Sequence, residues 1–251
     1  MSTCLLAFDT STEVLALVVD GPQGAFAEQT AGGAAASAAL LPALHALMQR
    51  AGVAMHQVQA IAFGQGPGAF TGLRTSCAVA QGLGLGLGRP VLPLDSLLLV
   101  AEDARGQLAA DDLDVLVLVD ARMDEVYAGL YRWAGQAWQV LQAPGLYSLP
   151  GLAALLAAVA PGRPVAVAGS ALNALGDRLG LPVDAAWQRC PQEVDRAAAL
   201  LQLARRAWAD GVAVDAAQAL PLYLRDKVAQ TTAEREALKR AASGAAPATD
   251  A

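Results

Sequence analysis

The sequence predicts an α/β protein built from two related lobes, each a mixed sheet covered by helices. Two apolar runs, Leu5–Asp9 and Leu116–Asp120, each indicate a buried strand that ends in an aspartate. Two further strand-like runs follow each of them, and then helical segments that alternate with short apolar runs. Because this order occurs twice, it is typical of a duplicated α/β unit. We place an N-terminal lobe at residues 1–106, a C-terminal lobe at 107–230 and a flexible tail at 231–251, with the boundary between the lobes near 107–114.

The composition indicates a soluble protein with a large core. Of the 251 residues, 55% are hydrophobic and only 16% are charged, and the formal net charge is −6. No apolar run reaches the roughly 18 residues that span a bilayer, and Met1–Leu6 lacks the features of a signal peptide. We therefore expect a cytoplasmic protein without a membrane segment, in which Cys4, Cys77 and Cys190 are buried free thiols. The net negative charge argues against a protein that grips nucleic acid by itself.

The first lobe opens with an antiparallel meander and a helix. Strands are predicted at 3–8, 14–19 and 25–30, and the helix at Ser37–Gly52. One face of this helix is apolar and consists of Leu40, Leu41, Leu44, Leu47, Met48 and Ala51. A second face carries small residues, Ala39, Ala43 and Ala46, beside Arg50. Ordinary packing within the chain and close approach by a second helix both explain this second face.

A glycine-rich stretch, Gly64–Arg74, lies between a predicted strand at Ala60–Phe63 and a predicted helix at Thr75–Leu87. Its glycines permit positive φ angles and close backbone approach, and we expect Thr71 to cap the helix. The loose match to the dinucleotide-binding pattern is discounted, because Pro67 removes an amide donor and no carboxylate follows about 20 residues later. Two interpretations remain: contact with an anion or a partner's backbone, or a tight turn that lets a helix pack on a sheet.

The rest of the chain continues the alternation. Gly82, Gly84 and Gly86 should each cost about 1 kcal/mol in a helix, so either backbones come close there or the helix has ended. A strand is predicted at 90–94, and Asp95 is expected to cap a helix over 97–105. In the second lobe we predict strands at 115–119, 125–133, 137–141 and 165–169, and helices at 149–159, 170–179 and 193–210. We expect 221–225 to dock on the core, 232–242 to be helical and 243–251 to be disordered.

Two aspartates and two arginines are candidates for chemistry. Asp9 and Asp120 each end an apolar strand, and as a pair across a cleft they could orient a nucleotide, a metal or a water molecule. The alternative is that each bonds the backbone of its own turn. Arg74 and Arg122 could bind phosphate or carboxylate, or form local salt bridges. Metal ligation and nucleophilic catalysis lack support, because the two histidines have no ligand spacing and no G-x-S-x-G motif is present.

Several of these motifs together resemble the TsaB family, also called YeaZ, over roughly residues 3–230. The resemblance is carried by the Asp9-Thr10-Ser11-Thr12 turn, by Ser37 with Leu40-Leu41-Pro42, by the glycine-rich stretch and by the string Asp120-Ala121-Arg122-Met123-Asp124-Glu125-Val126-Tyr127. The motif-loop residues are Asp9, Thr10, Ser11, Gly66, Gly68, Thr71, Gly72, Asp120 and Arg122. The resemblance implies the duplicated actin/Hsp70/sugar-kinase fold, known as ASKHA, and a part in the bacterial machinery that places threonylcarbamoyl on N6 of the adenosine next to the tRNA anticodon.

The resemblance further implies a subunit that is not an enzyme. In this family the related subunit TsaD holds the metal through an HxxxH motif, whereas the matching stretch here, Asp95–Glu102, has no histidine. We therefore expect no metal and no cofactor. The implied role is to bind and activate TsaD in a complex with TsaE, to form a homodimer when alone, and to meet tRNA only indirectly. The implied interface comprises Ala39, Ala43, Ala46, Leu47, Arg50, Arg74, Cys77, Ala78 and Gln81.

Two other functions compete with this one. The first is a stand-alone nucleotide-dependent phosphotransferase or peptidase of the same superfamily, which the two aspartates leave open. The second is a homodimeric scaffold without any link to a transferase.

Overall fold

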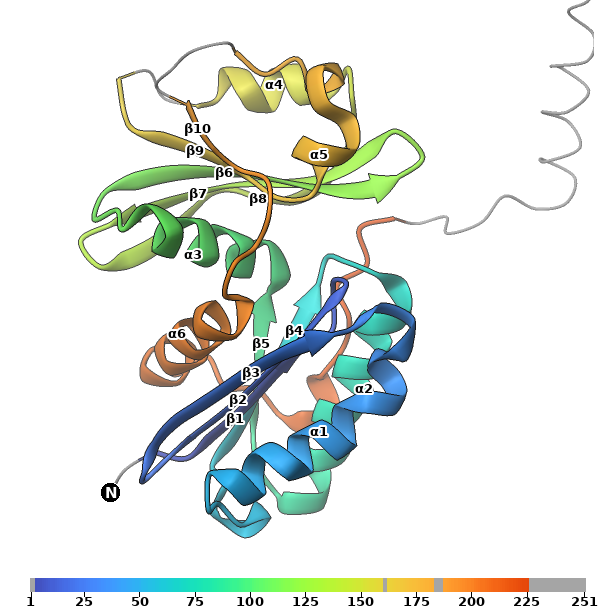
Figure 1. Cartoon of the computed structure of the whole chain (residues 1–251), viewed down its shortest axis with the longest axis vertical. Coiled ribbons are helices and arrows are strands. Elements are labelled where there is room, and N and C mark those ends of the chain that lie inside the picture. The colour runs from blue at the N-terminus through green and yellow to red at the C-terminus, as the bar shows by residue number, and fades with distance from the viewer. Residues whose placement is uncertain (1–2, 160–161, 183–186, 226–251) are drawn as a thin grey trace, which may run out of the picture.

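The computed structural model, which describes residues 3–159, 162–182 and 187–225, contains two five-stranded sheets with helices between and outside them (Figure 1). The first sheet has the order β3-β2-β1-β4-β5, from β1 (Leu5–Asp9), β2 (Val14–Gly21), β3 (Gly24–Ala31), β4 (Ala60–Gly66) and β5 (Val91–Asp95). The second has the order β10-β9-β6-β7-β8, from β6 (Leu113–Arg122), β7 (Glu125–Ala134), β8 (Ala137–Ser148), β9 (Val165–Ala168) and β10 (Trp187–Cys190).

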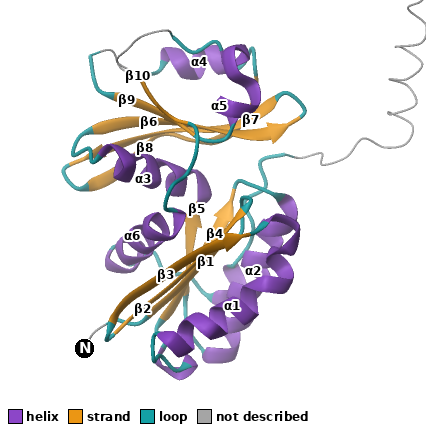
Figure 2. Ribbon diagram, viewed as in Figure 1, coloured by secondary structure: helices purple, strands orange, loops and turns teal. Residues whose placement is uncertain are grey.

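The two sheets repeat one topology. In each, the first three strands are antiparallel and the fourth and fifth run parallel to the first. The order of helices along the chain is also repeated, with three α-helices in each half of the described structure (Figure 2). They are α1 (Ala36–Arg50), α2 (Phe70–Leu87) and α3 (Ser96–Leu108) in the first half, and α4 (Leu152–Ala157), α5 (Ala171–Leu175) and α6 (Arg196–Ala209) in the second. This is the duplicated ASKHA-like architecture that the sequence predicted.

The first sheet is covered on both faces. Every residue of β1 is buried, and because side chains alternate along a strand they divide between two cores. Leu6 and Phe8 pack under α1 and α2, whereas Leu5 and Ala7 pack under α6. A fully apolar strand that ends in a single aspartate therefore places that aspartate at the edge of two cores.

The helices α3 and α6 are exchanged between the halves. On α3, Leu97 and Val100 pack against Val115 and Val117 of the second sheet. On α6, Leu200 packs on the first sheet, against Leu5 and Ala7 among others. Figure 1 shows both helices in the layer between the sheets. Because of this exchange, dividing the chain near residues 107–114 would separate each of these helices from the sheet on which it packs.

The start of α2 differs from the prediction. The helix begins at Phe70, its N-cap is Ala69, and no side chain caps it, so the expected cap by Thr71 is wrong. Instead, the amide of Ala69 donates to the carbonyl of Ser11, and this contact with the first hairpin sets the helix start. The helix then continues through its glycines to Leu87.

Other boundaries also differ. The helices α4 and α5 are shorter than predicted, β8 is longer, and β10 was not predicted. Leu41, which we assigned to the buried face of α1, is 52% exposed, because it lies one residue beyond the stripe that faces the sheet.

Several local predictions are confirmed. The three cysteines are buried and free, and the Asp95 carboxylate caps α3 by accepting from the amides of Leu97 and Leu98. The segment 221–225 docks on the core, where the amide of Leu222 donates to the carbonyl of Gln65. The predictions for 232–242 and 243–251 lie outside the described residues. No helix within the described ranges has the length and apolar character to cross a bilayer.

Candidate functional site

The Asp9–Ser11 turn follows β1 and is buried throughout. The Asp9 carboxylate accepts from the amide of Ser11 (3.1 Å), from its hydroxyl (2.9 Å) and from the hydroxyl of Ser96 (3.2 Å). The backbone contact is the turn-forming role that we weighed for this aspartate. The Ser96 hydroxyl holds the carboxylate in place from the start of α3.

The glycine-rich stretch packs directly against this turn. A Cβ on Gly64 would lie 1.6 Å from the Asp9 carboxylate, and one on Gly72 would lie 1.8 Å from the carbonyl of Thr10. The Thr10 hydroxyl donates to the carbonyl of Gly72 at 2.6 Å. These glycines therefore serve contacts within the chain, which supports the tight-turn interpretation.

Arg196, the first residue of α6, completes this buried cluster. Its guanidinium donates to Asp9 (2.9 Å) and to the Ser11 hydroxyl (2.9 Å), and it also pairs with Glu193. Only 1% of Arg196 is exposed. Burial opposes its charge, but the Asp9 and Glu193 carboxylates outweigh burial and raise the pKa of Arg196. The Asp9 carboxylate is thus already paired with a permanent cation.

Sequence reasoning missed Arg196. Nothing in the local pattern of residues 193–196 distinguishes it from an exposed arginine at a helix start. The charge of Asp9, buried at the end of an apolar strand, was the one available signal that a buried partner was needed.

Asp120 lies at the equivalent position of the second lobe, at the end of β6. Its carboxylate accepts from the amide of Arg122 (2.8 Å) and pairs with the Arg122 side chain (3.1 Å). Asp9 and Asp120 share no hydrogen-bond partner among residues 3–159, 162–182 and 187–225. Each carboxylate bonds within its own turn, and no hydrogen bond or ion pair joins the two among the described residues.

The two candidate arginines have different surroundings. Arg122 forms the local salt bridge just described, and 80% of its side chain is exposed. Arg74 stacks on Phe70, with its guanidinium carbon 3.9 Å from the ring centre, and donates to the hydroxyl of Tyr223 at 2.8 Å. Within the part of the chain that is described, Arg74 forms no salt bridge.

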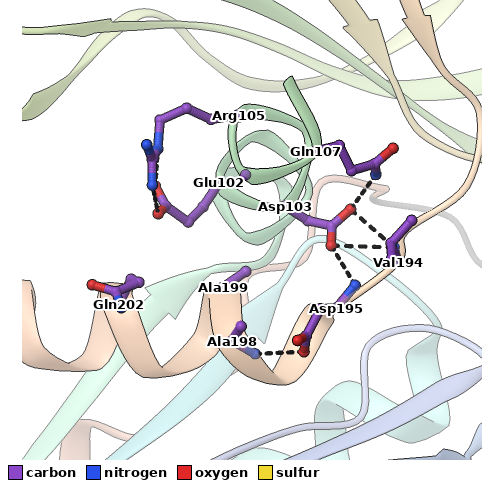
Figure 3. A pocket seen from close by; sticks show the side chains of 10 residues that line it. Glu102, Asp103, Arg105, Gln107, Val194, Asp195, Ala198, Ala199 and Gln202 are labelled. Carbon is purple, nitrogen blue, oxygen red and sulfur yellow. Dashed lines mark hydrogen bonds and ion pairs between the residues drawn. The ribbon is translucent and has the colours of Figure 1, made fainter. Parts of the chain in front are cut away.

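A hollow lies elsewhere, between α3 and the start of α6 (Figure 3). It has a volume of about 320 Å³. The Asp103 carboxylate at its wall accepts from the amides of Val194 and Asp195 and from the Gln107 side chain. The side chain of Asp195 in turn accepts from the amide of Ala198. Because these polar groups satisfy one another, the hollow offers no carboxylate in need of a ligand. Among the residues that the structure describes, no group of three or more His, Cys, Asp or Glu side chains could hold a metal ion.

The outer surface of the first lobe is formed by α1 and α2, which lie side by side over the sheet (Figure 1). We call the outward side of these two helices the α1–α2 face. Its exposed residues are Ala38, Leu41, Pro42, His45, Ala46 and Gln49 on α1, and Arg74, Ala78, Gly82, Leu85 and Gly86 on α2.

Several residues of the expected interface do not reach this face. Leu47 and Cys77 are buried in the core, and burial raises the pKa of Cys77 to about 12. They cannot touch a partner, and assigning them to the interface was wrong. Ala39 and Ala43 are half-buried against the same core.

The remaining members of the set lie at or near the surface. Arg50 pairs with Glu28 at 2.7 Å, and Gln81 donates to the carbonyl of Ala217. Ala46, Arg74 and Ala78 are exposed. The exposed α1–α2 face is therefore shifted by one or two residue positions around the helices from the interface that the spacing of small residues suggested.

Comparison with known proteins agrees with this architecture. A family model described as TsaD, tRNA N6-adenosine threonylcarbamoyltransferase, matches residues 33–232. The tRNA threonylcarbamoyladenosine biosynthesis protein TsaB of Escherichia coli is 30% identical over 235 residues, which are 90% of this chain and 96% of that protein. The TsaB protein of Haemophilus influenzae is 38% identical over 128 residues, 49% of this chain and 51% of its own length. The solved structure of YeaZ from Pseudomonas aeruginosa superimposes with a TM-score of 0.77 at 34% identity, covering 88% of this chain and all of that one.

This chain belongs to the TsaB family. The match to the TsaD model fits a paralogous relationship between the TsaB and TsaD families. In this TsaB-family chain, the Asp9 carboxylate pairs with Arg196. The Asp95–Glu102 segment contains no histidine. The second lobe's Asp120 turn, by contrast, is open to solvent at Arg122.

Proposed function

We propose that this chain is a non-catalytic subunit that binds and activates TsaD for the N6-threonylcarbamoylation of adenosine next to the anticodon, in tRNAs that read codons beginning with A. In this proposal TsaE completes the complex, the chain forms a homodimer when TsaD is absent, and tRNA contacts the complex mainly through other subunits. The chain acts in the cytoplasm.

The observation that carries the proposal is the α1–α2 face. Leu41 is 52% exposed and Leu85 is 62% exposed. On α2 beside Leu85, Gly82 and Gly86 have no atom from outside their own helix backbone within 4 Å of the place where a Cβ would be. Packing inside the monomer therefore does not account for either glycine. Small residues let two helices approach closely, and exposed leucines beside them supply apolar area.

The buried cluster at Asp9 supports the non-catalytic part of the proposal. A carboxylate that is to bind a metal–nucleotide complex must be free to do so, whereas Asp9 is saturated by Arg196, Ser11 and Ser96. Releasing it would break the buried ion pair and leave the Arg196 guanidinium with Glu193 as its remaining carboxylate partner, which is unfavourable. The matched architecture of the TsaB and TsaD families supports the choice of partner, because equivalent helix pairs can face each other across a pseudo-twofold axis.

Gly82→Arg tests the interface. The side chain projects into open space in the monomer, so the fold is retained, but it would block a helix approaching α2. Gly106→Arg is the matched control, since Gly106 lies in α3 and has equally open surroundings. In size-exclusion chromatography with TsaD, we expect the control to form the complex and Gly82→Arg to elute separately.

Activity is read in a reconstitution with TsaD, TsaE, threonylcarbamoyl-adenylate and tRNA. We expect modification with the wild-type chain and the control, and a loss with Gly82→Arg. A complex that forms undiminished with Gly82→Arg would remove the α1–α2 face from the proposal. Robust ATP turnover by the purified chain alone, abolished in Asp9→Asn, would overturn the non-catalytic role.

A further inference from the structure

The hairpin between β6 and β7 has an unusual backbone. Arg122, Met123 and Asp124 have φ angles of 65°, 58° and 59°, and Arg122 pairs with Glu125 across the ladder. A two-residue hairpin loop with positive φ at both central positions normally uses Asn-Gly or a similar pair. Here the two positions hold methionine, for which this conformation costs about 1–3 kcal/mol, and aspartate, which tolerates it better. Such a conformation persists only when surrounding contacts enforce it.

Residues close to Met123 in the sequence form three ion pairs: Asp120–Arg122 at 3.1 Å, Asp124–Arg178 at 2.9 Å and Glu125–Arg225 at 2.5 Å. Met123 itself is 66% exposed, and its sulfur lies 3.9 Å from the Arg225 guanidinium. The three pairs cancel in charge. An exposed methionine beside charge-neutral arginine–carboxylate pairs has the composition of a protein–protein interface, in which Met and Arg are enriched.

The same turn is tied to the first lobe. Arg225 donates to the carbonyls of Ala121 (3.0 Å) and Arg122 (3.4 Å) as well as to Glu125. Two residues before it, Tyr223 accepts a hydrogen bond from Arg74 of α2. The segment 223–225 thus makes a continuous connection from the α1–α2 face to the hairpin of the second lobe.

We propose that this hairpin, Arg122–Asp124, is a second docking element for the protein that binds the α1–α2 face. Met123 enters a shallow apolar pocket of that partner, and the three ion pairs lie at the rim of the contact. The element rests on the proposed function, because it extends the same interface onto the second lobe. Its rigid backbone lowers the entropy lost on binding, and engagement of both lobes fixes the angle between them in the complex.

Met123→Asn tests the proposal, with binding of the full-length chain to TsaD measured by isothermal titration calorimetry. Asparagine suits a positive φ, so the hairpin is retained while the apolar tip is lost. We expect the dissociation constant to rise about ten- to a hundredfold, each factor of ten being about 1.4 kcal/mol. Val140→Ala is the control, because Val140 is 56% exposed on β8 opposite Tyr131, away from the hairpin. It should change the constant less than about twofold, as surface contacts outside an interface contribute little.

The outcomes separate the two proposals. If Met123→Asn binds like the wild type while Gly82→Arg does not, the docking element is wrong and the α1–α2 interface stands. If the wild-type chain does not bind TsaD at all, both proposals fall. Met123→Ala also removes the apolar tip and leaves the three ion pairs in place. It replaces Met123→Asn in the binding measurement if the asparagine variant folds poorly. Wild-type affinity for TsaD in the folded variants rejects the hairpin as a docking element.

Discussion

The Arg196 guanidinium donates to the Asp9 carboxylate at 2.9 Å, although 187 residues separate the two positions. This bond joins the end of β1 in the first half of the chain to the start of α6 in the second half. Both side chains are fully buried. The pair closes the place where the turn after β1 would otherwise present a free carboxylate, and it anchors the helix that covers the first sheet.

Removal of this cation should destabilise the protein strongly. In Arg196→Met, the Asp9 carboxylate stays buried without its partner, and we expect the free energy of unfolding to fall by about 3–5 kcal/mol. Urea denaturation measures it. The exposed pair Arg50–Glu28 supplies the control, because Arg50→Met should cost less than about 1 kcal/mol. Equal effects of the two substitutions would show that the buried pair does not support the fold, and the double variant Asp9→Asn/Arg196→Met should recover part of the loss.

The effect of replacing a glycine by alanine on stability should depend on the space around that glycine. A Cβ at Gly64 would collide with the Asp9 carboxylate at 1.6 Å, whereas Gly82 and Gly106 have open space. We expect Gly64→Ala to lower stability by at least about 2 kcal/mol through overpacking, and Gly82→Ala and Gly106→Ala each to raise it by up to about 1 kcal/mol through helix propensity. Thermal unfolding followed by circular dichroism distinguishes the two directions. A tolerated Gly64→Ala would contradict the close packing of β4 on the Asp9 turn.

The ion pairs of Asp114 with Arg132 and Arg163 should make the free energy of unfolding depend on pH in the acid range. Burial alone would raise the pKa of the Asp114 carboxyl, but the hydrogen bonds and charge of Arg132, followed by those of Arg163, lower it below 3.8. A lowered folded-state pKa contributes stability above the unfolded value, and that stability is lost as the pH falls through the folded-state pKa. Asp114→Asn should therefore be less stable than the wild type by about 1–3 kcal/mol at pH 7.

This difference should shrink as the pH falls below about 4, where the carboxyl of the unfolded chain becomes protonated, and it should be lost once the pH passes the lowered folded-state pKa. Denaturation curves for both proteins between pH 2.5 and pH 7 test it. A difference that stays constant across this range would show that a structural change, rather than the charge of Asp114, causes the loss.

The strained hairpin should respond to the conformational preference of residue 123. Because asparagine adopts positive φ more readily than methionine does, we expect Met123→Asn to raise the free energy of unfolding by about 1 kcal/mol. Met123→Ala keeps the unfavourable backbone and should not be stabilised. A loss of stability in Met123→Asn would mean that packing of the methionine side chain outweighs the backbone strain.

Sequence patterns predicted the duplicated fold because their signals are local. The apolar strands that end in Asp9 and Asp120, the meander after each and the cap by Asp95 depend on residues only a few positions apart. The same locality explains the errors. The start of α2 is set by Ser11, from the first hairpin, and not by the nearby Thr71. Leu41 lies on the periodic stripe of the sequence but outside the surface that the sheet covers.

The amino-acid sequence by itself thus determined two mixed sheets, the glycine turn, the free thiols and the membership of a family. Only the tertiary structure decided which cation neutralises Asp9, which helix covers which sheet, and which residues of α1 and α2 remain exposed. Periodicity specifies that a residue is buried but not against what, because the partner comes from a distant part of the chain. The hairpin at Met123 is likewise contacted by Arg225 and Arg178, which no local pattern connects to it.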